Sequence, residues 1–279
     1  MSEEITKADI AACKPDHAAG AGIVAKAEAV GMSKVNMPIS RMWWLGIAAG
    51  LFIGTGALFM TYVKADQTLS FAVASVFGAA MFSIGLIMVV IAGAELFTGN
   101  SLMVIAAMNK KITWGGLAKN WVVVYIANLV GSLLLVLIIV GTGVMSMKAG
   151  DNTIGNQMVA VASGKMNLDA LSIFCRGIMC NFLVCLAVWM GFAGRTVIDK
   201  IVTCMFPVTA FVGMGFEHCV ANMFFLPMGC VASAMGYGSV GVLPIAGCFY
   251  NIAFATLGNI VGGAIFVGIL YWLAYRNKA

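Results

Sequence analysis

Six runs of mostly apolar residues follow one another along the chain, separated by short polar stretches. A helix needs about 20 such residues to cross the hydrocarbon core of a bilayer. The runs lie at roughly 42–63, 71–109, 116–146, 168–193, 200–228 and 247–275. The pattern predicts six transmembrane helices in a domain of residues 41–275, preceded by an N-terminal segment (1–40) and followed by a short C-terminus (276–279).

Polar residues interrupt the second and the fifth run at corresponding points. Residues 93–100 and 215–222 share the pattern Gly-x-Glu-x-x-x-x-Asn, displaced by 122 positions. Irregular backbone at membrane depth is tolerated only where it lines a cavity or is buried in protein. We therefore predict that helices 2 and 5 are broken, with short halves that begin near Asn100 and Asn222.

The two halves of the chain also repeat outside these interruptions. Asn128-Leu-Val-Gly in the third run matches Asn259-Ile-Val-Gly in the sixth. Each half, about 41–146 and 168–275, contains three spans, and an odd number of spans gives the halves opposite orientations. The predicted fold class is an all-α membrane protein made of two inverted three-helix repeats.

Composition and charge agree with this class. The 279 residues are 62% hydrophobic and 10% charged, with a mean hydropathy of +1.00, whereas soluble domains carry roughly 25% charged residues. Twelve Lys and Arg residues lie on the side of the termini and three on the other side, which predicts cytoplasmic termini. Residues 18–34 are expected to form a short, weakly amphipathic helix that is a docking or lid segment on the membrane surface.

The candidate chemistry gathers at the interruptions. Broken helices expose N–H groups, which suit a small anion. His218 is the one histidine within the spans, and imidazole can change charge near neutral pH. The symmetric placement of Glu95 and Glu217 indicates that they accept hydrogen bonds from interrupted backbone or an asparagine. The Thr98 hydroxyl can bind an anion or its own backbone, and Lys165 either concentrates anions at a pore mouth or is an ordinary solvated lysine.

Other classes of function fit less well. No nucleophile–base pair and no cluster of metal ligands accompanies His218, and the eight cysteines form no Cys-x-x-Cys pair. We therefore expect no enzyme, no metal, no cofactor and no nucleic-acid partner. A neutral-solute channel of the aquaporin type would carry Asn-Pro-Ala at both breaks, where this chain has Thr-Gly-Asn and Val-Ala-Asn.

The strings at these positions resemble the formate/nitrite transporter family over essentially all six spans. They are Ala94-Glu95-Leu96-Phe97-Thr98-Gly99, Gly215-Phe216-Glu217-His218, Ala221-Asn222-Met223, and Asn181 followed by Leu183-Val184-Cys185-Leu186-Ala187-Val188-Trp189-Met190. The resemblance implies a homopentamer of aquaporin-like protomers in a bacterial cytoplasmic (inner) membrane. Each protomer would have its own pore for small monovalent anions.

The resemblance also implies roles for single residues. By motif position the family's central histidine is His218, its loop threonine Thr98 and its vestibule lysine Lys165, while its conserved asparagines are Asn181 and Asn259. The two apolar constrictions correspond to Phe82, Leu86, Leu96 and Phe97, and to Phe211.

The substrate implied first is formate, with nitrite or hydrosulfide as alternatives. Residues 111–121 and 224–229 resemble the formate-conducting members, whereas the Glu-Leu-Phe-Thr-Gly loop is closer to nitrite-type members. A bare anion pays a large desolvation cost in a narrow apolar passage. We therefore hypothesise that His218 transiently protonates the anion, so that neutral formic acid crosses and transport is coupled to protons.

Overall fold

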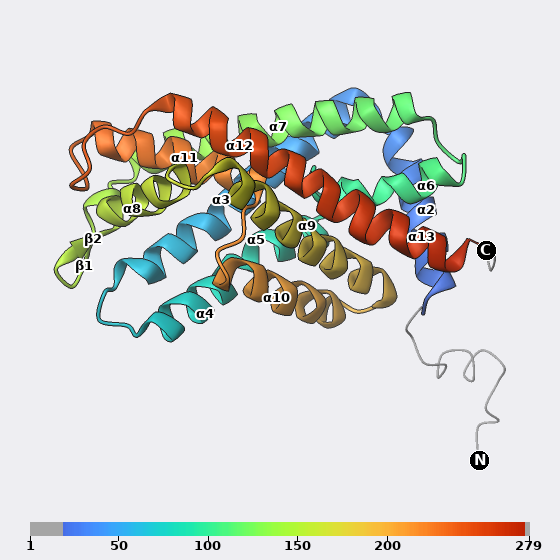
Figure 1. The fold of residues 1–279 in the computed structure, drawn as a ribbon, viewed down its shortest axis with the longest axis horizontal. Helices are drawn as coiled ribbons and strands as arrows, with labels where there is room; N and C mark the ends of the chain where they lie inside the picture. The colour runs from blue at the N-terminus through green and yellow to red at the C-terminus, as the bar shows by residue number, and fades with distance from the viewer. Residues whose placement is uncertain (1–18, 277–279) are drawn as a thin grey trace, which may run out of the picture.

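The computed structural model describes residues 19–276, whose regular secondary structure is helical apart from one short hairpin (Figure 1). Five continuous segments are long and apolar enough to cross a membrane. They are α3 (Ile39–Ala65); Phe71–Gly93, made of α4 (Phe71–Phe82), α5 (Ile84–Met88) and the π-helical η1 (Val89–Gly93); α7 (Trp114–Gly141); α9 (Ala170–Ala193); and Ile245–Tyr275, made of α12 (Ile245–Ile260), the π-helical η4 (Val261–Ile269) and α13 (Leu270–Tyr275).

Shorter elements complete the described chain. They are α2 (Ala21–Val35), the 3₁₀-helical η2 (Gly99–Met103), α6 (Val104–Met108), the 3₁₀-helical η3 (Val144–Ser146), the antiparallel strands β1 (Lys148–Ala149) and β2 (Asn152–Thr153), α8 (Ile154–Met166), α10 (Val197–Gly213) and α11 (Cys219–Ala234). The fifth predicted span is therefore two helices of 17 and 16 residues. Neither reaches the length needed to cross alone, which is why five segments qualify where the hydropathy pattern gave six.

Each interruption begins at a glycine with a backbone conformation that other residues adopt only with strain. Gly93 has φ 83° and Gly215 has φ 72°, both in the left-handed region. A Cβ atom at either position would meet nothing within 4 Å. Glycine is therefore required for its backbone conformation and not for lack of space. After the first break the chain re-enters a helix at η2, and after the second at α11, with His218 as the N-cap residue.

Glycines also let the long helices of each half approach closely. A Cβ atom on Gly131 of α7 would lie 2.1 Å from the carbonyl oxygen of Ile47 on α3, and one on Gly262 of η4 would lie 2.1 Å from that of Ile178 on α9. The two contacts are equivalent, because each pair is displaced from the other by 131 positions. This close backbone packing is typical of membrane helices, where small residues form the interfaces.

The helix α2 packs against the rest of the fold, and its expected place at the membrane surface stays a prediction. Its residues Ile23, Val24 and Ala27 are buried in a cluster with residues of η2, α6 and α9. The helix α8 packs on α11 and α12 in the same way. In Figure 1, α2 and α6 lie at one end of the molecule and α8 with the hairpin at the other, and the described chain starts and finishes at the α2 end.

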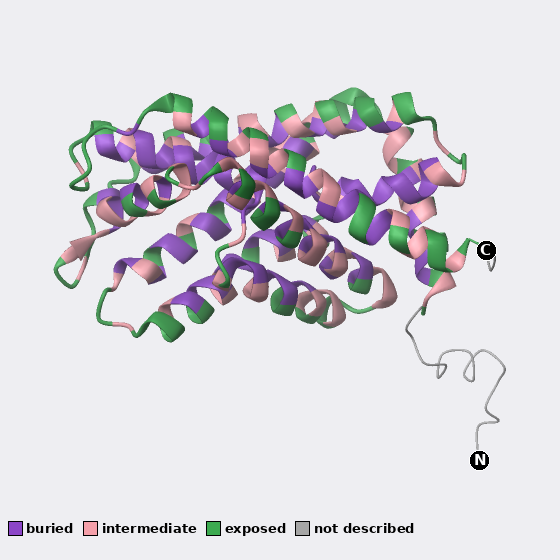
Figure 2. Cartoon of the chain, in the orientation of Figure 1, coloured by how far each residue is buried: buried purple, intermediate pink, exposed green. Residues whose placement is uncertain are grey.

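The outer surface is more apolar than that of a soluble protein, and polar groups are buried within the mostly apolar core. Large apolar side chains on the outside are highly exposed, such as Trp44 (68%), Phe71 (85%) and Phe249 (74%), and exposed positions follow the outer helical faces (Figure 2). The interior instead contains buried asparagines, two glutamates and a histidine. A bilayer accounts for this pattern, since lipid solvates the apolar faces while buried polar groups bind one another.

Candidate functional site

The two interruptions meet at one hydrogen bond in the interior. Thr98, at the end of the first, and His218, at the end of the second, are joined by a bond of 3.0 Å between Oγ1 and Nε2. Both side chains are buried. On its other ring nitrogen, His218 accepts a hydrogen bond of 3.0 Å from the backbone N–H of Ala221. Residues 120 positions apart in the sequence therefore form a single polar centre.

These two bonds assign the state of the imidazole. Since the N–H of Ala221 points at Nδ1, that nitrogen carries a lone pair and no hydrogen. A neutral imidazole then has its one hydrogen on Nε2, where it is donated to Thr98. The hydroxyl hydrogen of Thr98 is left to donate to a further acceptor. The N-terminus of α11, with its partial positive charge, also favours the neutral ring over the cation.

Asn259 holds the second interruption in place. Its Nδ2 donates to the carbonyl oxygens of Gly177 (2.8 Å) and Glu217 (2.9 Å), and its Oδ1 accepts from the N–H of Cys219 (2.9 Å). The amide thus satisfies broken backbone on both sides of His218. Because buried backbone groups need partners, we infer that Asn259 fixes the position of the histidine.

Asn128 does the same for the first interruption. Its Nδ2 donates to the carbonyl oxygens of Gly46 (2.8 Å) and Glu95 (2.9 Å), and its Oδ1 accepts from the N–H of Phe97 (3.0 Å). Asn181 adds a bond across the halves, from its Nδ2 to the carbonyl oxygen of Thr98 (3.2 Å), and one within the second half, to that of Asn259 (2.7 Å). Asn181 and Asn259, predicted as pathway residues, therefore bind backbone.

Glu217 forms a buried cluster behind the histidine. Its Oε1 accepts from Lys165 Nζ at 2.8 Å, and its Oε2 accepts from Asn222 at 2.7 Å and from Asn251 at 3.2 Å. The carboxylate is 1% exposed and the lysine side chain 16%. A buried carboxylate with a cation and two amide donors is fully compensated, so its charge does not act on His218 as an unpaired anion.

Glu95 forms the equivalent cluster at the other interruption. Its Oε1 accepts from Lys34 Nζ at 2.5 Å and its Oε2 from Asn100 at 2.9 Å, while Asn100 also donates to Asn120 at 2.8 Å. Lys34 belongs to α2, in the segment that we placed outside the channel domain. These are the two ion pairs found among residues 19–276.

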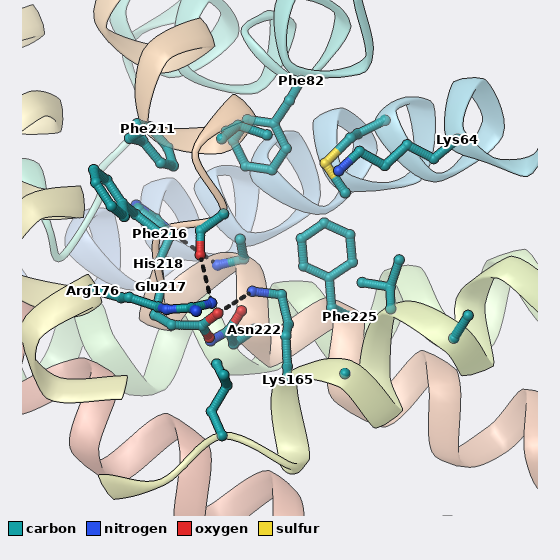
Figure 3. A pocket seen from close by; sticks show the side chains of 18 of the residues that line it. Lys64, Phe82, Lys165, Arg176, Phe211, Phe216, Glu217, His218, Asn222 and Phe225 are labelled. Atoms are coloured by element: carbon teal, nitrogen blue, oxygen red, sulfur yellow. Dashed lines mark hydrogen bonds and ion pairs between the residues drawn. The ribbon is translucent and has the colours of Figure 1, made fainter. Parts of the chain in front are cut away.

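One cavity adjoins each interruption. The first, which we call the Lys165 cavity, has a volume of about 310 Å³ and is lined by Lys165, Glu217 and His218 together with Phe82, Phe211, Phe225 and others. Figure 3 shows these side chains pointing into it. The second, the Lys34 cavity, measures about 370 Å³ and is lined by Lys34, Glu95, Leu96 and Asn100 among others. Cations line both cavities, which is an arrangement that attracts anions.

Apolar rings close the Lys165 cavity towards the histidine. The ring centroids of Phe82 and Phe211 lie 5.9 Å apart, and Phe211 stacks on His218 at 5.9 Å. Phe97 packs on Trp121 and Tyr125 of α7, at 6.0 and 4.9 Å. The structure thus groups the predicted constriction residues differently from the sequence. Phe82 joins Phe211, Leu96 lines the Lys34 cavity, and Phe97 and Leu86 line neither cavity.

Comparison with known proteins agrees with this geometry. The formate/nitrite transporter family model matches residues 21–273. The formate channel FocA of Escherichia coli (strain K12) is 38% identical over 265 residues, covering 90% of this chain and 92% of FocA. The uncharacterised transporter YrhG of Bacillus subtilis (strain 168) is 40% identical over 268 residues, covering 95% and 94%.

The chain belongs to the formate/nitrite transporter family. A solved structure of a member, described as a pentameric formate channel with formate bound, superimposes with a TM-score of 0.78 at 39% identity. It covers 85% of this chain, which covers 98% of that one. Membership of this family makes the chain a multi-pass membrane protein and a transporter, not an enzyme.

Several residues of the site were not predicted from the sequence. Lys34 and Asn120 lie 131 positions before Lys165 and Asn251, the same displacement that relates Asn128 to Asn259. Applying that displacement to the whole chain would have found both residues, and would have included α2 in the first repeat. Lys64 and Arg176 also line the Lys165 cavity, and no motif in the sequence marks them.

Proposed function

We propose that this protein conducts formate across the membrane through the two cavities and the Thr98–His218 centre. Support comes from FocA, a formate channel to which the chain is 38% identical over nearly its full length, and from the similar fold of a channel that holds formate. The observation that carries the proposal is the bond between Thr98 and His218. It leaves the Thr98 hydroxyl, oriented by His218, as a neutral hydrogen-bond donor between two cavities that are lined by cations.

The arrangement provides a favourable partner at each stage of the passage. In the Lys165 cavity the cations replace part of the anion's hydration energy. The rings of Phe82 and Phe211 then exclude water, which makes the loss of hydration costly. The hydroxyl of Thr98 offsets part of this cost by donating a hydrogen bond to the carboxylate. The Nε2–H of His218 donates to Thr98 Oγ1 and so directs the hydroxyl hydrogen towards the anion. Other cations that line the Lys34 cavity (Lys26, Arg41 and Lys200) attract the anion on the far side.

We further propose that His218 acts in its neutral form, as a donor. An imidazolium would place a hydrogen on Nδ1, against the N–H of Ala221 that now donates to this atom. It would also place a cation at the N-terminus of α11, where the helix dipole opposes it. Both features weigh against the proton-exchange hypothesis that the sequence motivates.

Variants of His218 distinguish the two mechanisms. His218→Asn retains a neutral N–H donor but cannot titrate. If His218 works as a neutral donor, this variant keeps the shape of the pH–flux profile at reduced amplitude. If His218 exchanges protons, the variant loses the inflection near the ordinary pKa of imidazole, about 6.5, and that result would overturn our assignment.

The assembly and location that we propose follow the relatives. We infer a homopentamer, supported by the pentameric formate channel of similar fold, in a bacterial cytoplasmic (inner) membrane with both termini in the cytoplasm. The two ends of the described chain support a shared side, since Gly20 and Tyr275 are in contact. On this orientation the Lys34 cavity faces the cytoplasm.

Flux into proteoliposomes that contain the purified protein tests the function directly. Formate, nitrite and hydrosulfide are compared at about pH 5.5 and about pH 7.5, on either side of the ordinary pKa of imidazole. We expect formate to enter fastest. Faster entry of nitrite or hydrosulfide would reassign the substrate within the family, and entry of water without any anion would refute the proposal in favour of a neutral-solute channel.

A further inference from the structure

The Lys165 cavity contains two cations that neither the ion pairs nor the helix packing account for. Lys64, near the end of α3, and Arg176, in the first half of α9, both line it. Neither forms an ion pair with an acidic side chain of the described residues, because Glu217 is occupied by Lys165 and the other buried pair joins Lys34 to Glu95. The cavity therefore has three cationic side chains and one carboxylate.

Each of the two side chains is directed so that its charge reaches the cavity. The stem of Lys64 lies near Gly78, at 3.5 Å from a Cβ built there, and its amine extends from this apolar surface. Arg176 uses one N–H on the carbonyl oxygen of Gly215, at 3.5 Å, and a guanidinium has five such donors. Figure 3 shows the two side chains entering from opposite sides, with Lys165 between them.

The internal repeat shows that the fold does not need a cation at position 176. The counterpart of Arg176, 131 positions earlier, is Leu45. The two residues have the same backbone role, since the carbonyl oxygen of Leu45 accepts from Glu95 N–H and that of Arg176 from Glu217 N–H. Leu45 lines the Lys34 cavity as Arg176 lines the Lys165 cavity. The arginine therefore contributes its charge, beyond what the packing at this place requires.

Lys64 is placed at an electrostatic cost unless an anion is present. It is partly buried and lies within range of the positive charge of Lys165. Like charges in a partly desolvated cavity repel each other, and an anion between them removes that repulsion. The position of Lys64 therefore indicates a cavity arranged to hold negative charge.

We propose that Lys64 and Arg176 form an anion-binding subsite in the Lys165 cavity, separate from the Thr98–His218 centre, which holds a small monovalent carboxylate before it enters the apolar constriction. The subsite rests on the proposed function, since it presumes that anions pass here. It concentrates substrate at the mouth and so lowers the concentration needed for half-maximal flux. The Lys165–Glu217 pair remains structural, because its charges compensate each other.

The test is the concentration dependence of formate flux in proteoliposomes, measured for Lys64→Met, Arg176→Leu and the double variant. At roughly 8 Å in a water-like dielectric, each cation changes anion occupancy about two- to threefold. We expect the half-saturating concentration of sodium formate to rise about two- to threefold for each single variant and about fivefold for the double variant. Maximal flux should change less, and added salt should slow the double variant less than the wild type.

Two further variants control for charge and for position. Lys148→Met removes an exposed cation of the hairpin that does not line the cavity, and it should leave half-saturation unchanged. Lys64→Arg with Arg176→Lys keeps both charges and should retain the wild-type value. Should the neutral double variant fail to assemble, Arg176→Leu alone decides the question, since leucine occupies the equivalent position in the first repeat.

The outcomes separate this inference from the proposed function. Wild-type protein that passes no formate refutes the function. If the wild type passes formate but the flux through Lys64→Met and Arg176→Leu depends on formate concentration and on salt as it does for Lys148→Met, the subsite alone is refuted. A rise confined to the neutralising variants supports it.

Discussion

The ion pair between Lys165 and Glu217 gives the sharpest test of how the second interruption is held. Glu217→Gln keeps the shape of the side chain and removes its charge. Lys165 then stays largely buried without a counter-ion, with its side chain 16% exposed. Breaking a buried pair by neutralising one partner costs about 3 to 5 kcal/mol. We expect about 3 kcal/mol, because Lys165 can turn part of its charge towards solvent in the cavity.

The assay is heat-induced loss of helical circular dichroism for the purified protein in detergent. A destabilisation of about 3 kcal/mol lowers the melting temperature of a protein near this size by about 6 to 12 °C. In Glu217→Gln with Lys165→Met the unpaired cation is also removed. The double variant should therefore melt above Glu217→Gln, with a coupling energy of at least about 1 kcal/mol.

Two comparisons make the result interpretable. Asp151→Asn neutralises an exposed turn residue and should change the free energy of unfolding by less than about 0.5 kcal/mol. Glu95→Gln breaks the equivalent pair with Lys34 and should behave like Glu217→Gln. A melting temperature of Glu217→Gln within about 2 °C of the wild type would contradict this reasoning. So would a double variant whose loss in free energy of unfolding equals the sum of the losses in the two single variants.

Three further substitutions test the site and the fold. Thr98→Val removes the hydroxyl that bonds His218; formate flux should fall about tenfold or more, since a hydrogen bond to a charged group is worth about 1.5 to 3 kcal/mol, and unchanged flux would exclude the hydroxyl from the pathway. The melting temperature should also fall, because the buried Nε2–H of His218 loses its acceptor at a cost of about 1 to 3 kcal/mol. Gly93→Ala forces a side chain to φ 83° and should cost about 1 kcal/mol, whereas Gly141→Ala, at the end of α7 with open space around it, should be neutral in the same melting experiment. Gly262→Ala places a Cβ 2.1 Å from the carbonyl oxygen of Ile178 and should abolish the assembled species on size-exclusion chromatography, and a normal elution profile would contradict the close packing.

The predicted class of fold was right because its signals are local. Apolar length and polar interruptions are properties of continuous sequence, and a bilayer acts on them directly. The same holds for the glycines that open both breaks, since positive φ is a requirement of one residue. The family strings around Glu95 and His218 identified the transporter family, and the comparisons confirm it.

The sequence did not give the packing partners that depend on how helices face one another. Phe82 packs on Phe211, and Phe97 packs on Tyr125 of α7. The helix α2 packs on α6 and α9, although its apolar pattern is weak. Hydropathy reports how apolar a face is, and it carries no information on which neighbour covers that face.

A membrane protein with two interrupted helices and a repeated plan can be recognised from the amino-acid sequence, because each of those features is encoded within a few neighbouring residues or in a fixed displacement. The polar groups that meet are known from the packed helices alone: Thr98 with His218, Lys34 with Glu95, and Arg176 beside the cavity. A buried polar group is stabilised by whichever partner the packed helices bring within about 3 Å, and that partner depends on the rotation and crossing of helices far apart in the chain.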